Sequence, residues 1–350
     1  MNDMNEEDIG IVPHHIFLGL IQLNGIGFQT LYNFCHEGKH LSDLMMTENL
    51  DEFTKLLGRS FDTNAYDVND WKFFLNYIID LGINLSSQFA KNGITFLLAS
   101  DYQFPKFPEN MKKPIYWLFI EGKVENLYIY NSLALIGSRE SSSIGSFLAH
   151  TLLFGASCVK EKLVTISGLA AGIDQIVHEI SLFLDIPTIA VLGNGLNENY
   201  PINSTELRRK IINSGGTIIT EYFPNMKPSK ESFVNRNRIQ AALARTVIPL
   251  EWKEKSGTAH TIRYANEMDK QVLYVETNQC RKNKTDHSIA NHKAQIKYGG
   301  EIFLLPNAIN DLISKLDLQV NQPTIITSEN NGNHSQNKDF KQPQQIGLDF

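Results

Sequence analysis

One short segment of the 350-residue chain combines residue types that can bind a phosphate. Gly137-Ser138-Arg139 directly follows the apolar run Leu133–Ile136, and further serines precede a helical pattern. Glycine permits a tight turn, serine hydroxyls cap helices, and a guanidinium holds a phosphate through two hydrogen bonds. Two interpretations fit this segment. It is an anion site for a nucleotide or a nucleic-acid backbone, or it is an ordinary strand–helix turn with an exposed arginine.

A second turn has the same character. Ser167-Gly168-Leu169-Ala170-Ala171-Gly172 follows the apolar run Leu163–Ile166 and opens another helical pattern. Two glycines separated by small residues permit a close approach of the backbone to a ligand. Asp174 falls in the first turn of the predicted helix, where a carboxylate suits the helix dipole. This residue therefore either caps the helix or contacts a ligand.

Arginines flank an asparagine where a further helix begins. Arg236, Asn237 and Arg238 form an arrangement that faces phosphates in nucleic-acid-binding proteins, although Arg238 has a second interpretation as a structural residue that ties loops together. Ser256-Gly257-Thr258 opens one more helix and forms another small turn that tolerates an anion.

Three aromatic residues near these turns are candidates for stacking on nucleic-acid bases, and each has an alternative place in the core. These residues are Tyr200, Tyr222 and Phe223.

The pattern contains no activated nucleophile. GxSxG, the Rossmann GxGxxG and the P-loop GK[ST] are missing from the sequence. The cysteines, Cys35, Cys158 and Cys280, are too widely spaced for a disulfide framework or a zinc site. We therefore expect no catalytic residue, no metal and no cofactor, and a site that holds phosphates without breaking bonds.

Seven short apolar runs predict the element that positions these turns. They are Leu133–Ile136, Leu163–Ile166, Ile189–Leu192, Ile218–Thr220, Val247–Leu250, Val272–Val275 and Ile302–Leu305. The runs lack polar alternation and are separated by stretches with helical spacing, which is typical of a parallel sheet buried on both faces. We predict an α/β fold with an extended Rossmann-like, doubly wound, mostly parallel sheet. The turns then converge on the carboxyl edge of that sheet.

Three regions are expected along the chain. Residues 1–126 form a small helical N-terminal region with a connecting strand and loop, residues 127–317 the Rossmann-like domain, and residues 318–350 a polar disordered tail. The turn Leu23–Gly27 in the first region is either a helix-hairpin-helix turn or, as we favour, a plain connection between helices. The final Ile346–Phe350 is either a docking peptide or, as we favour, inert.

Charge and hydropathy exclude several classes of protein. Lys and Arg total 32 against 38 Asp and Glu, and the net charge of -6 excludes a uniformly basic coat protein. No apolar run approaches the roughly 18 residues of a membrane span. The acidic start lacks the features of a signal peptide, so the cytoplasm is the expected location.

Together these motifs resemble the DNA-processing protein A family (DprA, also called Smf). The resemblance extends from about Pro114 to Leu316 and rests on Ala134–Arg139, Ser167–Asp174, Val191–Leu196, Tyr200-Pro201, Glu221-Tyr222, Phe233–Ile239 and Ser256–Thr258. It implies a homodimer that binds single-stranded DNA and helps to load a RecA-type recombinase during natural transformation. Arg139 matches the family's phosphate-gripping arginine, the Gly168–Gly172 turn lines the same pocket, and Arg236–Arg238 match its Arg-Asn-Arg segment.

Two departures from the family leave other functions open. Ile202-Asn203-Ser204 stands where members often carry a lysine, for which Arg208 or Arg209 substitutes, and the polar tail replaces a winged-helix domain. One alternative is a nucleotide-binding sensor or a phosphoribohydrolase-like enzyme that uses Glu221 or Asp174. Another is a component of a phage-defence system on the same fold.

Overall fold

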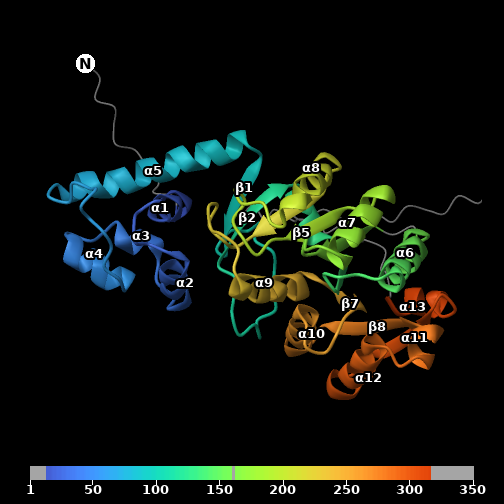
Figure 1. Ribbon diagram of the computed structural model, residues 1–350. Helices are drawn as coiled ribbons and strands as arrows, with labels where there is room; N and C mark the ends of the chain where they lie inside the picture. Colours follow the sequence, from blue (N-terminus) through green and yellow to red (C-terminus); the bar gives the residue numbers. More distant parts are fainter. Residues whose placement is uncertain (1–12, 160–161, 317–350) are drawn as a thin grey trace, which may run out of the picture. The chain divides into compact units, whose positions relative to one another are not determined.

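The computed structural model describes residues 13–159 and 162–316 of the chain. Helices come first, coloured blue in Figure 1: α1 (Pro13–Leu20), α2 (Phe28–His36), α3 (Leu41–Leu44), α4 (Leu50–Leu57) and α5 (Trp71–Lys91). Their apolar faces meet around Phe17, Phe53 and Phe74, all fully buried. The small helical N-terminal region expected from the sequence is therefore confirmed. The Leu23–Gly27 turn joins α1 to α2, and a role for it on DNA stays a prediction.

A nine-stranded sheet follows. Its strands are β1 (Ile94–Leu98), β2 (Trp117–Gly122), β3 (Asn131–Gly137), β4 (Leu163–Ser167), β5 (Thr188–Val191), β6 (Thr217–Thr220), β7 (Thr246–Glu251), β8 (Gln271–Thr277) and β9 (Glu301–Leu305). Their order is β1-β2-β6-β5-β4-β3-β7-β8-β9. The strands from β3 to β9 pair in parallel, whereas β1 and β2 are antiparallel. The doubly wound, mostly parallel sheet is confirmed, and all seven apolar runs lie in or at the end of its strands.

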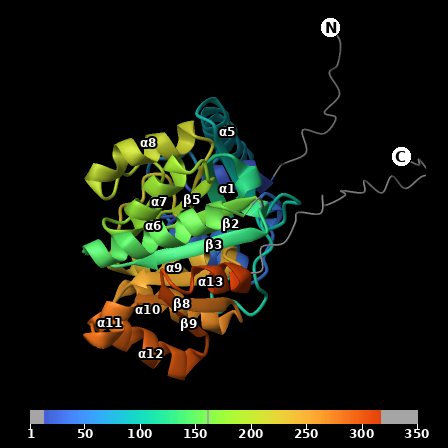
Figure 2. The ribbon, with the colours of Figure 1, turned by 90° about the vertical axis from the view of Figure 1, so that its right-hand side faces the viewer.

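Helices connect the parallel strands on both faces of the sheet. These are α6 (Ser143–Ser157), α7 (Ile173–Phe183), α8 (Thr205–Asn213), α9 (Lys230–Leu243), α10 (Gly257–Glu267), α11 (Asn278–Lys282), α12 (Asp286–Tyr298) and α13 (Ile309–Leu316), with short 3-10 helices at Val124–Tyr128 and Ile202–Ser204. One core contains side chains of α6, α7 and α13, and another contains those of α9, α10 and α12. Figure 2 shows β3 above β8 and β9, and β7 pairs between β3 and β8.

The strand order reverses at β3. This strand has β4 on one side and β7 on the other, so the crossovers leave it in opposite directions. At such a switch point the loops that follow the strands diverge and open a crevice for a ligand beyond the carboxyl ends. In this chain those loops are the ones that carry Arg139, Gly168 and Ser256.

The sheet also includes chain upstream of residue 127. Strand β1 pairs with β2, and β2 pairs with β6. Trp117 on β2 packs against Phe17 of α1, with ring centroids 4.8 Å apart. The boundary at residue 127 stays a prediction. It groups β1 and β2 with the helical region, although both strands belong to the sheet. The expected tail, residues 318–350, lies outside the described residues, and within the described ranges no helix is long and apolar enough to cross a bilayer.

Burial of His178 on α7 predicts acid sensitivity. Its Nδ1 lies 2.7 Å from Thr188 Oγ1, and burial, followed by the charge of Arg236, lowers its pKa to about 3. Between that value and the ordinary value of about 6.5 the unfolded chain binds the extra proton. We therefore expect the free energy of unfolding to fall as the pH drops below about 6.5. His178 should contribute up to about 1.4 kcal/mol of this loss per pH unit, and above pH 6.5 it should not affect the pH dependence of stability.

Urea unfolding at several pH values measures this effect. The variant His178→Gln keeps a hydrogen-bonding side chain beside Thr188 but does not titrate, so its stability should depend less steeply on pH than that of the wild type. Equal slopes for the two proteins between pH 4 and pH 6.5 would show that His178 is not the group responsible.

Candidate functional site

A cavity of about 600 Å³ opens at the carboxyl ends of β3, β4 and β7. We call it the switch-point cavity. Nine of the residues predicted from the sequence line it, namely Gly137, Ser138, Arg139, Tyr200, Arg236, Asn237, Ser256, Gly257 and Thr258. The other lining residues are Ile136, Glu140, Ala170, Asp174, Lys230, Phe233, Val234, Gln240 and Thr261. The fold thus brings three of the predicted turns and one face of α9 to one crevice. Arg236 and Asn237 lie inside this helix, which begins at Lys230, and not at its start as the sequence predicted.

Arg139 is an exposed cation of this cavity, and Lys230 is a second one. The Ser138 backbone N–H donates to Glu251 O at 2.6 Å and extends the β3–β7 pairing by one residue, which fixes the loop that carries Arg139. The guanidinium carbon lies 5.2 Å from the centroid of the Phe233 ring. Among the described residues no carboxylate lies within ion-pair distance of it. Arg139 therefore presents free donors to a ligand.

The N-terminus of α6 next to Arg139 is already occupied by the protein itself. Ser142 Oγ accepts from the N–H groups of Ile144 and Gly145, and Glu251 Oε2 accepts from the Ser142 N–H at 2.8 Å. The negative charge of the Glu251 carboxylate thus already stabilises the positive end of this helix dipole. Binding of an anion at this loop depends on Arg139 rather than on the helix terminus.

Arg236 lies buried at the base of the cavity. It donates to Gly168 O at 2.6 Å, to Val191 O, and to Asn237 Oδ1 at 2.9 Å, while Asp174 Oδ2 lies 3.7 Å away. Burial lowers the pKa of Arg236 and raises that of Asp174, and their mutual attraction opposes both shifts. The guanidinium stays protonated because its ordinary pKa is far above neutrality. Its donors are directed to the loops after β4 and β5, which it ties together.

The predicted turn after β4 supports the cavity from behind. A Cβ atom on Gly168 would stand 2.2 Å from Arg236 Nη2, so only glycine leaves room for this guanidinium. Gly172 has φ 82°, and a Cβ there would stand 2.3 Å from Ser138 O. Ser167 is buried and donates to Leu135 O, and Leu169 is buried as well. None of these four residues lines the cavity.

Arg238 does not reach the cavity, and the phosphate contact predicted for it is not what the structure shows. Its side chain and that of Glu221 are 3% and 4% exposed, and they form a two-point ion pair at 2.6 and 2.5 Å. Arg238 also donates to the carbonyls of Lys113 and Asn235. Arg238 is two residues after Arg236, and the resulting rotation of about 200° directs it to the other side of α9. The alternative interpretation, a residue that ties loops together, fits these contacts.

Two of the three predicted stacking residues belong to the core. Tyr222 is 3% exposed, and its hydroxyl donates to Ser232 O. Phe223 is partly buried, with its ring centroid 6.0 Å from that of Trp117. Both point toward the N-terminal helices, because the chain turns there after β6. Tyr222 therefore has almost no exposed surface for a base, and a stacking role for Phe223 stays a prediction.

The aromatic surface of the cavity consists of Tyr200 and Phe233. Tyr200 is 39% exposed, and its ring centroid lies 4.9 Å from that of Phe233. Phe233 was missed as a site residue. The signal for it was Ser229, which forms a capping box with Ser232 and so places Phe233 in the first turns of α9.

Two buried polar atoms of lining residues have no protein partner. Gln240 Nε2 and Ser256 Oγ are both buried and make no hydrogen bond. Buried donors and acceptors in native proteins are almost always satisfied, so each points to a ligand or solvent atom in the cavity. By contrast, neither arginine suggested as a substitute for the missing lysine is free. Arg208 pairs with Glu121 at 2.5 Å and Arg209 with Glu206 at 2.7 Å.

The fold and the cavity define a class of protein: a Rossmann-like α/β protein with a cationic and aromatic ligand site at its switch point. The family model of DNA recombination-mediator protein A matches residues 95–306, more than half of the chain. The chain therefore belongs to this family, as the sequence motifs indicated.

Relatives and solved structures agree with this assignment. The Smf protein of Synechocystis sp. is 34% identical over 181 residues, which cover 51% of this chain and 45% of that protein. DNA processing protein DprA of Streptococcus pneumoniae is 36% identical over 158 residues, covering 45% of this chain and 54% of that protein. The chain thus matches about half the length of these curated relatives.

Two solved structures share the fold. The crystal structure of DprA from Streptococcus pneumoniae covers 85% of this chain and 95% of that chain with a TM-score of 0.61 and 22% identity. The DprA structure from Helicobacter pylori, which concerns the single-stranded DNA binding mode of that protein, has a TM-score of 0.53 and 26% identity, and it covers 63% of this chain and 96% of that chain.

Proposed function

We propose that this chain binds single-stranded DNA in the switch-point cavity. The observation that carries the proposal is the exposed guanidinium of Arg139 beside the Tyr200–Phe233 pair. Proteins that bind single strands combine a cation for the phosphates with aromatic faces for the bases. The unpartnered Gln240 Nε2 and Ser256 Oγ add polar groups for a base or a sugar. Family membership and the Helicobacter pylori relative support the same ligand.

The chemistry of the site supports binding without cleavage. Glu221, one carboxylate considered for a phosphoribohydrolase, is held in the buried pair with Arg238 away from the cavity. Asp174 lines the cavity, but it is buried and its Oδ2 lies 3.7 Å from the guanidinium of Arg236, whose charge stabilises the carboxylate where it lies. We therefore favour a binding protein over a nucleotide-cleaving enzyme.

Family membership supports a proposal for the cellular role. We propose that the chain acts as a cytoplasmic homodimer in DNA processing during transformation and delivers the bound strand to a RecA-type recombinase. A phage-defence role on the same fold is the competing proposal. Pull-down of a RecA-type recombinase by the DNA-loaded protein favours the first proposal, and the absence of any such interaction favours the second.

Fluorescence anisotropy with labelled strands tests the binding proposal. A single strand should bind more tightly than a duplex of equal length, because stacked and paired bases cannot reach Tyr200 and Phe233. The logarithm of the association constant should fall linearly with the logarithm of salt concentration, with a slope of about -0.7 for each phosphate contacted. Equal affinity for the two forms of DNA, or release of free base from any nucleotide, would contradict the proposal.

A further inference from the structure

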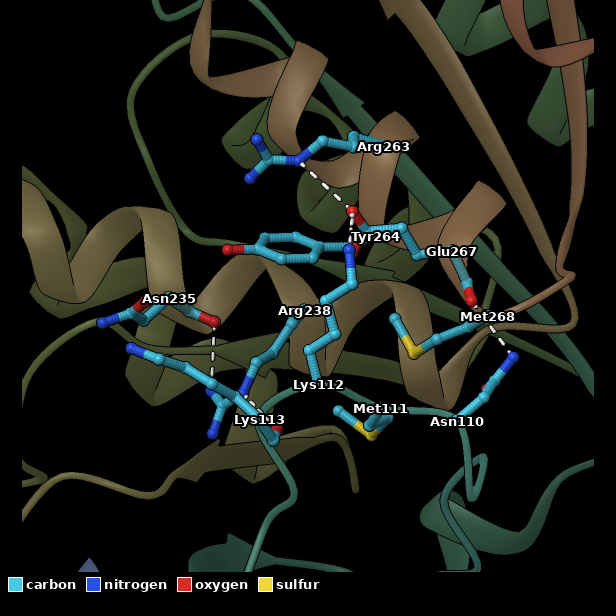
Figure 3. Close-up of a pocket in the computed structure, with 10 residues that line it drawn as sticks. All are labelled: Asn110, Met111, Lys112, Lys113, Asn235, Arg238, Arg263, Tyr264, Glu267 and Met268. Atoms are coloured by element: carbon cyan, nitrogen blue, oxygen red, sulfur yellow. Dashed lines mark hydrogen bonds and ion pairs between the residues drawn. The ribbon is translucent and has the colours of Figure 1, made fainter.

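A second cavity, of about 340 Å³, lies where the loop before β2 meets α9 and α10. We call it the lysine pocket, and it is defined by Lys112 and Lys113 from the loop and by Arg263 from α10 (Figure 3). Its charged lining residues are four cations, including Arg238, and one carboxylate, Glu267. Since the charge of Arg238 is balanced by Glu221, the pocket keeps a net charge of about +2.

The three cations differ in how they are engaged. Lys112 Nζ lies 2.9 Å from Glu267 Oε1, and Arg263 Nε lies 4.0 Å from the same oxygen, so one carboxylate oxygen stands between them (Figure 3). Lys113 makes no ion pair in the described part of the chain, and Figure 3 shows it extended beside Asn235. Lys113 is thus unpaired among the described residues, and Lys112 and Arg263 share one carboxylate oxygen. The positive charge of the site exceeds its negative charge, so the site can bind a further anion.

The lysine pocket and the switch-point cavity lie on opposite sides of α9. Asn237 and Gln240 line the switch-point cavity, whereas Asn235 and Arg238 line the lysine pocket. On α10, Thr258 lines the switch-point cavity and Tyr264 lines the lysine pocket. At a rise of about 1.5 Å per residue those two positions are roughly 9 Å apart along the helix. A single strand spans this distance within a few nucleotides.

We propose that the lysine pocket binds a backbone phosphate of the same single strand that occupies the switch-point cavity, so that the strand crosses α9. This inference rests on the proposed function. It predicts that a dinucleotide, which is too short to reach from one cavity to the other, uses the switch-point cavity alone. A strand of about 16 nucleotides, which is within the range of known single-strand sites, uses both cavities. It also predicts that Glu267 competes with the phosphate for Lys112 and Arg263.

Anisotropy with the two strand lengths tests the inference. For Lys113→Glu we expect roughly tenfold weaker binding of the long strand, a smaller salt slope and unchanged binding of the short strand. For Glu267→Gln we expect tighter binding of the long strand, by a factor of about two to five, which is a gain that structural damage would not produce. Lys72→Glu on α5 changes the net charge by the same amount far from the pocket and should leave both affinities as in the wild type.

The outcomes separate this inference from the proposed function. If the wild type binds both strands and Lys113→Glu binds the long strand as well as Lys72→Glu does, the lysine pocket is not a phosphate site and the proposed function stands. If the wild type binds neither strand, the proposed function itself fails. A long-strand affinity that falls in Glu267→Gln would also overturn the inference, because removal of a competing carboxylate cannot weaken an anion site.

Discussion

Replacing Glu221 by glutamine is expected to lower the free energy of unfolding by about 3 to 5 kcal/mol. Arg238 is buried, and both oxygens of the Glu221 carboxylate accept hydrogen bonds from its guanidinium. The neutral amide of glutamine leaves that charge without a partner in a site that water does not reach. Urea unfolding of the wild type and of Glu221→Gln measures the difference.

The pair between Arg209 and Glu206 is a matched control. It is also a two-point pair, at 3.0 and 2.7 Å, but its side chains are 61% and 58% exposed. Glu206→Gln should therefore change the stability very little, because water and salt screen the charges of an exposed pair. Replacing both Glu221 and Arg238 by methionine should recover much of the stability lost in Glu221→Gln, since apolar residues of similar volume substitute well for buried ion pairs.

The outcome also bears on the function of Arg238. If Glu221→Gln were no less stable than Glu206→Gln, the guanidinium of Arg238 would have to be accessible to water in solution. In that case the phosphate contact predicted from the sequence would become possible again, and the buried geometry described here would be wrong at this position.

Replacing Arg139 by alanine is expected to weaken the binding of single-stranded DNA by about 10- to 100-fold. A hydrogen bond to a charged group contributes about 1.5 to 3 kcal/mol, and among the described residues Arg139 has no carboxylate partner in the free state. Loss of one phosphate contact should also reduce the salt slope by about 0.7. Anisotropy titrations at low and at high salt measure both quantities.

Two further variants test whether the loss of affinity is specific to the guanidinium of Arg139. Arg139→Lys keeps the charge but loses the fork that holds a phosphate at two points, so its affinity should fall between those of the wild type and Arg139→Ala. Arg59→Ala removes an exposed arginine after α4 and should bind as the wild type does. An Arg139→Ala variant that bound strands normally at both salt concentrations would exclude the switch-point cavity as the site of the phosphate.

Several parts of this protein were determined by local sequence alone. The seven apolar runs predicted strands of the parallel sheet because strands buried on both faces need uninterrupted apolar side chains. The place of the site also followed from the sequence, since the loops after parallel strands must emerge at one edge of the sheet. Gly137, Ser138 and Arg139 were found in this way, and they line the switch-point cavity.

Only the tertiary structure decided which of the polar and aromatic side chains face that cavity. Arg236 and Arg238 are two residues apart in one motif, yet the former lies at the base of the cavity and the latter pairs with Glu221 on the other side of α9. From the sequence, Tyr222 and Phe223 were as plausible as Tyr200 for base stacking, but in the structure both pack against Phe28 of α2. Strand β2 was not assigned before the structure, because its position depends on pairing with β6 across roughly a hundred residues. Sequence periodicity indicates which residues are buried. It does not indicate which side chains they contact, because those contacts join segments that are distant in the chain.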